Sequence, residues 1–86
     1  MAAATVQGYY SDAELRLIRE AVDEQYEIAG SLKSALVHLN ILLKMDGVHD
    51  TFSKGKIFQR EAEAWGLPAD EATEEVQEFM QETGDI

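Results

Sequence analysis

Residues 32–43 read LKSALVHLNILL and are the most apolar stretch of the chain. Leucines recur there at spacings of three and four residues, which is the spacing of one face of an α-helix. Val37 and Ile41 lie nearly opposite these leucines on such a helix. A helix that is apolar on two faces is covered from two sides, so this stretch predicts a helix at the centre of an all-α protein.

The same apolar spacing continues toward the amino terminus as a heptad repeat. It begins after Ser11-Asp12-Ala13-Glu14, a capping-box sequence that predicts a helix start at Ser11. Gln25 is the one polar residue in the repeat before Asp46. The apolar positions are Leu15, Ile18, Val22, Ala29, Leu32, Leu36, Leu39 and Leu43.

The dipeptide Gly30-Ser31 leaves two models open. The heptad phase is preserved across Gly30, which favours one long first helix and three helices in all. A glycine inside that helix costs about 1 kcal/mol relative to alanine. Gly30 as a C-cap and Ser31 as an N-cap would instead give an αα-hairpin and four helices.

Two shorter helices are expected after the turn-forming residues 46–51. One runs from about Ser53 to Trp65, where Gly66 ends it, and the next from about Ala69 to Thr83, after Pro68. The sequence thus predicts a small helical bundle, with a flexible amino-terminal arm over residues 1–10 and a single helical domain over 11–86. The expected core is Leu15, Ile18, Val22, Leu32, Leu36, Leu39, Leu43, Ile57, Phe58, Trp65, Val76 and Phe79.

Charge is distributed very unevenly along the chain. The 86 residues carry 17 acids and 7 bases, a net charge of -10, and no lysine or arginine follows Arg60. Four bases gather near the central turn, namely Lys44, Lys54, Lys56 and Arg60. Five glutamates share one side of the last predicted helix and form what we call the acidic stripe: Glu71, Glu74, Glu75, Glu78 and Glu82.

The acidic stripe argues against direct binding of nucleic acid, because phosphates would meet like charge. It predicts a surface for a protein partner, with nucleic-acid-binding proteins among the candidates, since a row of carboxylates can imitate a row of phosphates. The alternative interpretation is a solvated surface that maintains solubility, because glutamate is a good helix former.

Catalytic, metal and membrane signals are weak in this sequence. There is no cysteine, and His38 and His49 have no partner at a metal-ligand spacing. Residues 46–57 match a calcium loop at too few ligand positions, and no phosphate-binding glycine loop is present. We therefore expect no metal, no cofactor and no enzymatic activity. No apolar run is long enough for a membrane span and the amino terminus lacks the features of a signal peptide, so a cytoplasmic location is expected.

A long helix followed by two shorter ones in about 90 residues resembles the layout of the helical chorismate mutases. The resemblance implies an intertwined dimer whose active site gathers several arginines and lysines around a dicarboxylate substrate. This chain offers Arg16, Arg19, Lys44 and Arg60 but no matching motif, and its net negative charge would repel such a substrate.

Three functional hypotheses follow from these patterns. The preferred one is a non-enzymatic protein-binding module, an inhibitor or adaptor of a larger complex that uses the acidic stripe. The second is an assembly subunit that forms a homodimer through an apolar self-association seam, because so short a chain is expected to be too small to cover both faces of residues 32–43. The third is a small helical enzyme of the layout above. The self-association seam comprises Leu32, Leu36, Val37, Leu39, Ile41 and Leu43.

Overall fold

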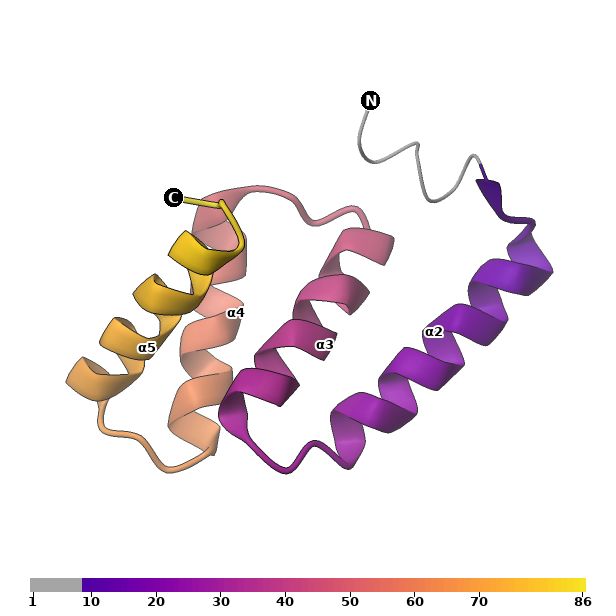
Figure 1. Cartoon of the computed structure of the whole chain (residues 1–86). Helices are drawn as coiled ribbons and strands as arrows, with labels where there is room; N and C mark the ends of the chain where they lie inside the picture. Colours follow the sequence, from indigo (N-terminus) through magenta and orange to yellow (C-terminus); the bar gives the residue numbers. More distant parts are fainter. Residues whose placement is uncertain (1–8) are drawn as a thin grey trace.

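The computed structural model describes residues 9–86, which form four helices joined by short turns and contain no strand. Consecutive helices run in opposite directions, with α2 at one edge of the molecule and α5 at the other (Figure 1). The predicted all-α bundle is thereby confirmed. The predicted arm lies outside the described residues except for Tyr9 and Tyr10, which are exposed. The helices are α2 (Asp12–Glu27), α3 (Leu32–Met45), α4 (Thr51–Ala64) and α5 (Ala69–Glu82).

The chain breaks between α2 and α3, so the favoured model of one long helix is wrong. α2 ends at Glu27, and the side chain of Ser31 accepts a hydrogen bond from the Ser34 amide (3.2 Å) at the start of α3. This cap satisfies one of the backbone amides that a helix start leaves unpaired. The turn also folds α2 back along α3, where it covers apolar surface that a continuous helix would leave exposed. Both helices of such a hairpin need an apolar stripe, which explains why the heptad pattern appears on each side of Gly30.

The other helix starts follow local sequence rules. The predicted capping box is confirmed, with hydrogen bonds in both directions between Ser11 and Glu14. The carboxylate of Asp50 accepts from the Ser53 amide (2.8 Å) and starts α4 two residues earlier than expected. Gly66 adopts a φ of +97°, a backbone conformation that favours glycine, and this turn leads through Pro68 into α5.

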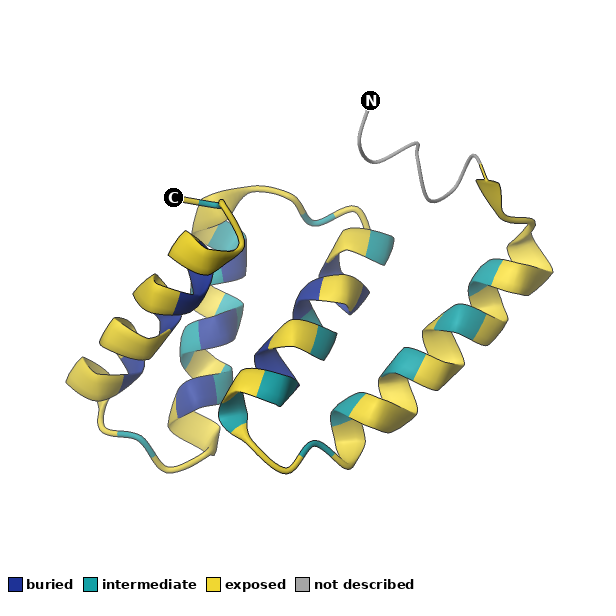
Figure 2. Cartoon of the chain, in the orientation of Figure 1, coloured by how far each residue is buried: buried dark blue, intermediate teal, exposed yellow. Residues whose placement is uncertain are grey.

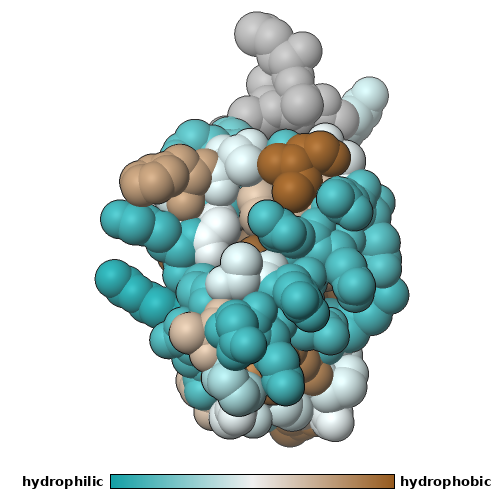
Figure 3. All heavy atoms as spheres, turned by 90° about the vertical axis from the view of Figure 1, so that its left-hand side faces the viewer, coloured by the Kyte–Doolittle hydropathy of each residue, from teal (hydrophilic) through white to brown (hydrophobic). Residues whose placement is uncertain are grey.

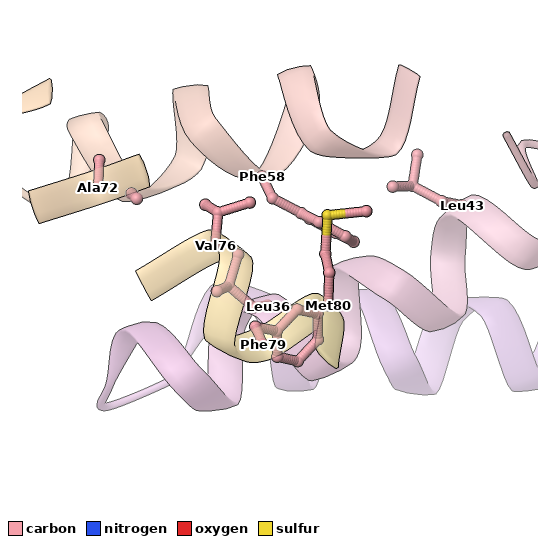
Figure 4. Packing of buried hydrophobic residues seen from close by; sticks show 8 residues of the cluster. Leu36, Leu43, Phe58, Ala72, Val76, Phe79 and Met80 are labelled. Atoms are coloured by element: carbon pink, nitrogen blue, oxygen red, sulfur yellow. The ribbon is translucent and has the colours of Figure 1, made fainter. Parts of the chain in front are cut away.

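The hydrophobic core lies between α3, α4 and α5 (Figure 4). Phe58 of α4 and Phe79 of α5 meet edge to face, with ring centroids 5.2 Å apart. Such a contact adds about 1 kcal/mol to the area that the rings bury. Small residues at Ala62 and Ala72 let α4 and α5 approach closely. The buried cluster is Leu36, Leu43, Phe58, Ala62, Ala72, Val76, Phe79 and Met80.

The predicted core is wrong for α2 and for Trp65. α2 contains no buried residue, and its Leu15, Ile18 and Val22 are half-buried (Figure 2). The reason is position, because α2 packs mainly on α3 and its apolar stripe has no second helix to cover it. Trp65 is 41% exposed and its indole Nε1 donates to Glu61 (2.8 Å).

Two polar contacts hold α2 against the rest of the bundle. The hydroxyl of Tyr26 donates to Glu61 of α4 (2.5 Å), and partial burial together with that contact raises the pKa of Tyr26 to about 12. Arg19 forms a two-point ion pair with Asp46, and the hydrogen bond from Arg19 holds the pKa of Asp46 below its usual value. The edge helix is thus fixed by surface and half-buried contacts rather than by a deep core.

Candidate functional site

The acidic stripe lies on the solvent side of α5, as the helical spacing predicts. All five glutamates are exposed, whereas Ala72, Val76, Phe79 and Met80 of the same helix face the core. Hydrophilic side chains cover much of this side of the molecule (Figure 3). The fold therefore leaves these carboxylates available to a partner instead of using them in the core.

One end of the acidic stripe is neutralised by a base from another helix. Lys33 of α3 lies 2.9 Å from a carboxylate oxygen of Glu82, and its pKa is raised first by that hydrogen bond and then by the charges of Glu82, Glu78 and Glu75. This pair could not be predicted from the sequence, because Lys33 and Glu82 are 49 positions apart. Within residues 9–86, the other four glutamates of the stripe form no ion pair.

The self-association seam is mostly occupied inside the chain. Leu36 and Leu43 belong to the core, and Leu32 and Leu39 pack against it. α3 packs on α2 and on α4, so the chain itself covers most of residues 32–43, but not the face predicted to lie opposite the leucines. Two seam residues, Val37 and Ile41, are 42% and 38% exposed and lie one turn apart on the outside of α3.

Lys54, one of the four bases near the central turn, lies inside the bundle. Its side chain is 2% exposed, and its Nζ lies 2.9 Å from Oδ1 of Asp85. Burial acts to raise the pKa of Asp85, but hydrogen bonds from Lys54 and Thr83 outweigh it and the pKa is lowered. Lys54 is therefore a structural residue, and Lys56 and Arg60 are the exposed bases of α4.

The side chains that could carry metal or catalytic chemistry are dispersed. His38 Nδ1 lies 2.7 Å from the carbonyl oxygen of Ser34, its own helix. Across residues 9–86 no group of three or more histidine, aspartate or glutamate side chains is arranged to hold a metal ion. The long first helix behind the resemblance to chorismate mutases is not present, because the chain turns back between Glu27 and Leu32.

Comparison of the chain with protein-family models, with curated proteins and with solved structures finds no match. In the described part of the chain, no helix combines the length and the apolar character that crossing a membrane requires. The chain's own surface is therefore the basis for a functional proposal.

Proposed function

We propose that this protein is a non-enzymatic protein-binding module, an inhibitor or adaptor that presents the acidic stripe of α5 to a basic surface of a larger complex. The class of partner that fits best is a protein with a positively charged groove, and nucleic-acid-binding proteins are the main example. Association would be steered by charge and would weaken as salt rises.

The observation that carries this proposal is the exposure of Glu71, Glu74, Glu75 and Glu78 on one rigid helix. None of them has an ion-pair partner within residues 9–86, and the core contacts of the opposite face fix the helix that carries them. A preorganised row of charges loses less entropy on binding than charges on a flexible tail. Solubility alone does not require such one-sidedness, because ordinary solvated helices mix both signs.

The test compares two variants that each remove three exposed carboxylates. The stripe variant is E74Q/E75Q/E78Q, and the matched control is E20Q/E24Q/E27Q on α2. Tagged wild-type and variant proteins are incubated with lysate of the native host at about 0.05 M and about 0.5 M salt. We expect a protein that wild type and control retain at low salt, and that both high salt and the stripe variant release.

Two results would contradict the proposal. One is retention that the stripe variant does not reduce, and the other is an equal loss with both variants, which would reflect net charge rather than the stripe. Circular dichroism of each variant verifies that all of them remain helical.

A self-associating assembly subunit is the second proposal, and the exposed pair Val37 and Ile41 supports it. Sedimentation of wild type and of V37D/I41D decides between the two proposals. A dimer that the double variant converts to monomer favours assembly, and a wild-type monomer removes it. A cytoplasmic location is part of both proposals and is tested by fractionation of the host cell.

A further inference from the structure

An open groove of about 510 Å³ runs between α4 and α5. Its lining is mainly apolar, with Phe52 and Gly55 from α4, Val76 and Met80 from α5, and Ile86. Phe52 is 73% exposed and Ile86 is 58% exposed, so the groove places large apolar side chains in contact with water. Figure 3 shows separate hydrophobic patches on this side of the molecule, with hydrophilic side chains beside them.

At both ends of the groove, hydrogen bonds join α4 to α5 or to the residues that follow α5, and they fix the spacing between the two sides. At one end Thr73 of α5 donates to Gln59 of α4 (3.3 Å), and Gln59 donates to the carbonyl oxygen of Ala69 (3.1 Å). At the other end Thr51 donates to the carbonyl oxygen of Asp85 (3.3 Å). The groove is thus preformed, which lowers the entropic cost of filling it.

Two exposed cations, Lys56 and Arg60, line the groove on the α4 side. The Nζ of Lys56 lies 4.7 Å from the centroid of the Phe52 ring, a cation–π contact that holds the ammonium beside the apolar surface. Within residues 9–86 neither cation forms an ion pair. The chain has a net charge of -10, so two cations beside an apolar groove make this region locally positive in an otherwise acidic protein.

The polar residues that α5 contributes to the groove are uncharged. They are Thr73 and Gln77, and the glutamates of the acidic stripe lie on an adjacent side of the helix, given 100° per residue. Lys56 and Arg60 are therefore the charged residues that line the groove, and no aspartate or glutamate of residues 9–86 lines it. The groove differs from the rest of the surface in both polarity and charge.

We propose that this groove docks an acidic amphipathic helix of a partner protein, with its apolar face on Phe52, Val76 and Met80 and its carboxylates on Lys56 and Arg60. A groove between two helices accepts a third helix through apolar residues spaced three and four apart. Gly55 lines the groove without a side chain, and a Cβ there would lie 3.8 Å from the sulfur of Met80. This surface is separate from the acidic stripe, so the inference does not depend on the function proposed above.

The shape of the groove and the packing of the chain argue against two other occupants. Small amphiphiles are usually bound in pockets that enclose most of their surface, whereas this groove is open along its length. A second copy of the chain would have to supply an acidic helix with a free apolar face. The apolar face of α5 is buried in the core, and that of α2 packs on α3.

The test uses a labelled synthetic helix of about 18 residues, with leucine on one face and glutamate on the other. Fluorescence anisotropy measures the affinity of this peptide for three full-length proteins. They are wild type, the groove variant K56Q/R60Q and the matched control R16Q/K44Q. Both double variants carry a net charge of -12, which is -10 minus two positive charges. We expect the groove variant to bind about tenfold more weakly, the control to bind like wild type, and high salt to remove the difference.

The site of binding is read from amide chemical shifts. The acidic peptide should shift the amides of Gly55, Thr73 and Gln77 and leave those of α2 unchanged. The stripe variant E74Q/E75Q/E78Q should not weaken binding of the acidic peptide, which separates this inference from the proposed function.

Three results would overturn the inference. The first is no binding of the acidic peptide, and the second is equal weakening by the groove variant and the control. The third is displacement of the peptide, either by self-association of the chain or by dodecanoate, a small amphiphile, that binds more tightly than the peptide. Either form of displacement would assign the groove to another occupant.

Discussion

The pair of Lys54 and Asp85 is the most buried ion pair within residues 9–86. Lys54 is 2% exposed, and Asp85 is the acid that balances its charge. Removing one partner of a buried pair leaves an uncompensated charge, whereas replacing the charge by an apolar side chain of similar size is often neutral or stabilising. The pair also joins residues that follow α5 to the first turn of α4, which fixes one end of the bundle.

We therefore predict that D85N lowers the free energy of unfolding by about 2 to 3 kcal/mol and that K54M/D85N recovers most of the loss. Urea denaturation at neutral pH measures both variants. Equal destabilisation of the single and the double variant would show that the Asp85 carboxylate acts through its hydrogen bond from Thr83, and not through Lys54.

Asn40 is a second polar residue inside the bundle. It is 5% exposed, and its Oδ1 accepts no hydrogen bond from residues 9–86. An unpaired buried amide oxygen costs about 1 to 3 kcal/mol. Leucine has nearly the same shape and needs no hydrogen bond.

We predict that N40L raises the free energy of unfolding by about 1 kcal/mol and that N40D lowers it, since aspartate would bury a charge. Thermal and urea unfolding of the two variants measure these changes. A loss of stability in N40L would mean that the amide has a partner in solution, for example an ordered water molecule.

At the level of the elements, α2 differs from the other three helices. α3, α4 and α5 share one buried cluster, whereas α2 has no buried residue and is held by a half-buried stripe and the contacts of Arg19 and Tyr26. Helices with few buried contacts open at lower free energy than the rest of a protein.

We predict that the amides of α2 exchange with solvent faster than those of α3 and α5 under native conditions. A matched pair of substitutions supports the same comparison. V76A should lower the free energy of unfolding by about 2 kcal/mol and V22A by less than half of that, because Val76 is 5% exposed and Val22 is only half-buried. Equal protection of all four helices would show that α2 is part of the cooperative core.

At the scale of the whole molecule, several separate contacts make the free energy of unfolding depend on pH. Four carboxyl groups have a pKa below the ordinary value, each because of a hydrogen bond in the folded chain. Ser11 acts on Glu14, Arg19 on Asp46 and Ser53 on Asp50, while Lys54 and Thr83 together overcome the effect of burial on Asp85. The folded state therefore binds fewer protons than the unfolded state in the acid range.

The sign of the pH dependence follows from these lowered values. Stability from each group is present above its unfolded pKa of about 4 and is lost as pH falls through the folded pKa. We predict that the free energy of unfolding is constant between about pH 5 and 7 and decreases below about pH 4. Urea denaturation across this range measures the decrease, and it should be shallower in K54M/D85N. An increase in stability on acidification would mean that relief of the net negative charge dominates.

Much of the fold follows from local sequence rules. The capping box at Ser11, the turn at Gly66 and the apolar spacing each act within about one helical turn, so the chain alone indicates the start of α2 and the boundary between α4 and α5. The acidic stripe is also local, since five glutamates on one helix share a side wherever that helix lies.

Other features depend on contacts between distant residues. Whether the chain passes straight through Gly30 or turns back is decided by the apolar surface that α2 and α3 bury together, and the heptad pattern fits both outcomes. The pairs Lys33–Glu82 and Lys54–Asp85 and the groove between α4 and α5 likewise arise from the packing of whole helices. The sequence by itself determined the all-α class and the charge of α5, because helix-forming patterns and charge depend on neighbours along the chain. The tertiary structure alone decided which faces are buried, which charges are paired and where an apolar groove meets two free cations, because packing energies act between residues that are far apart in sequence.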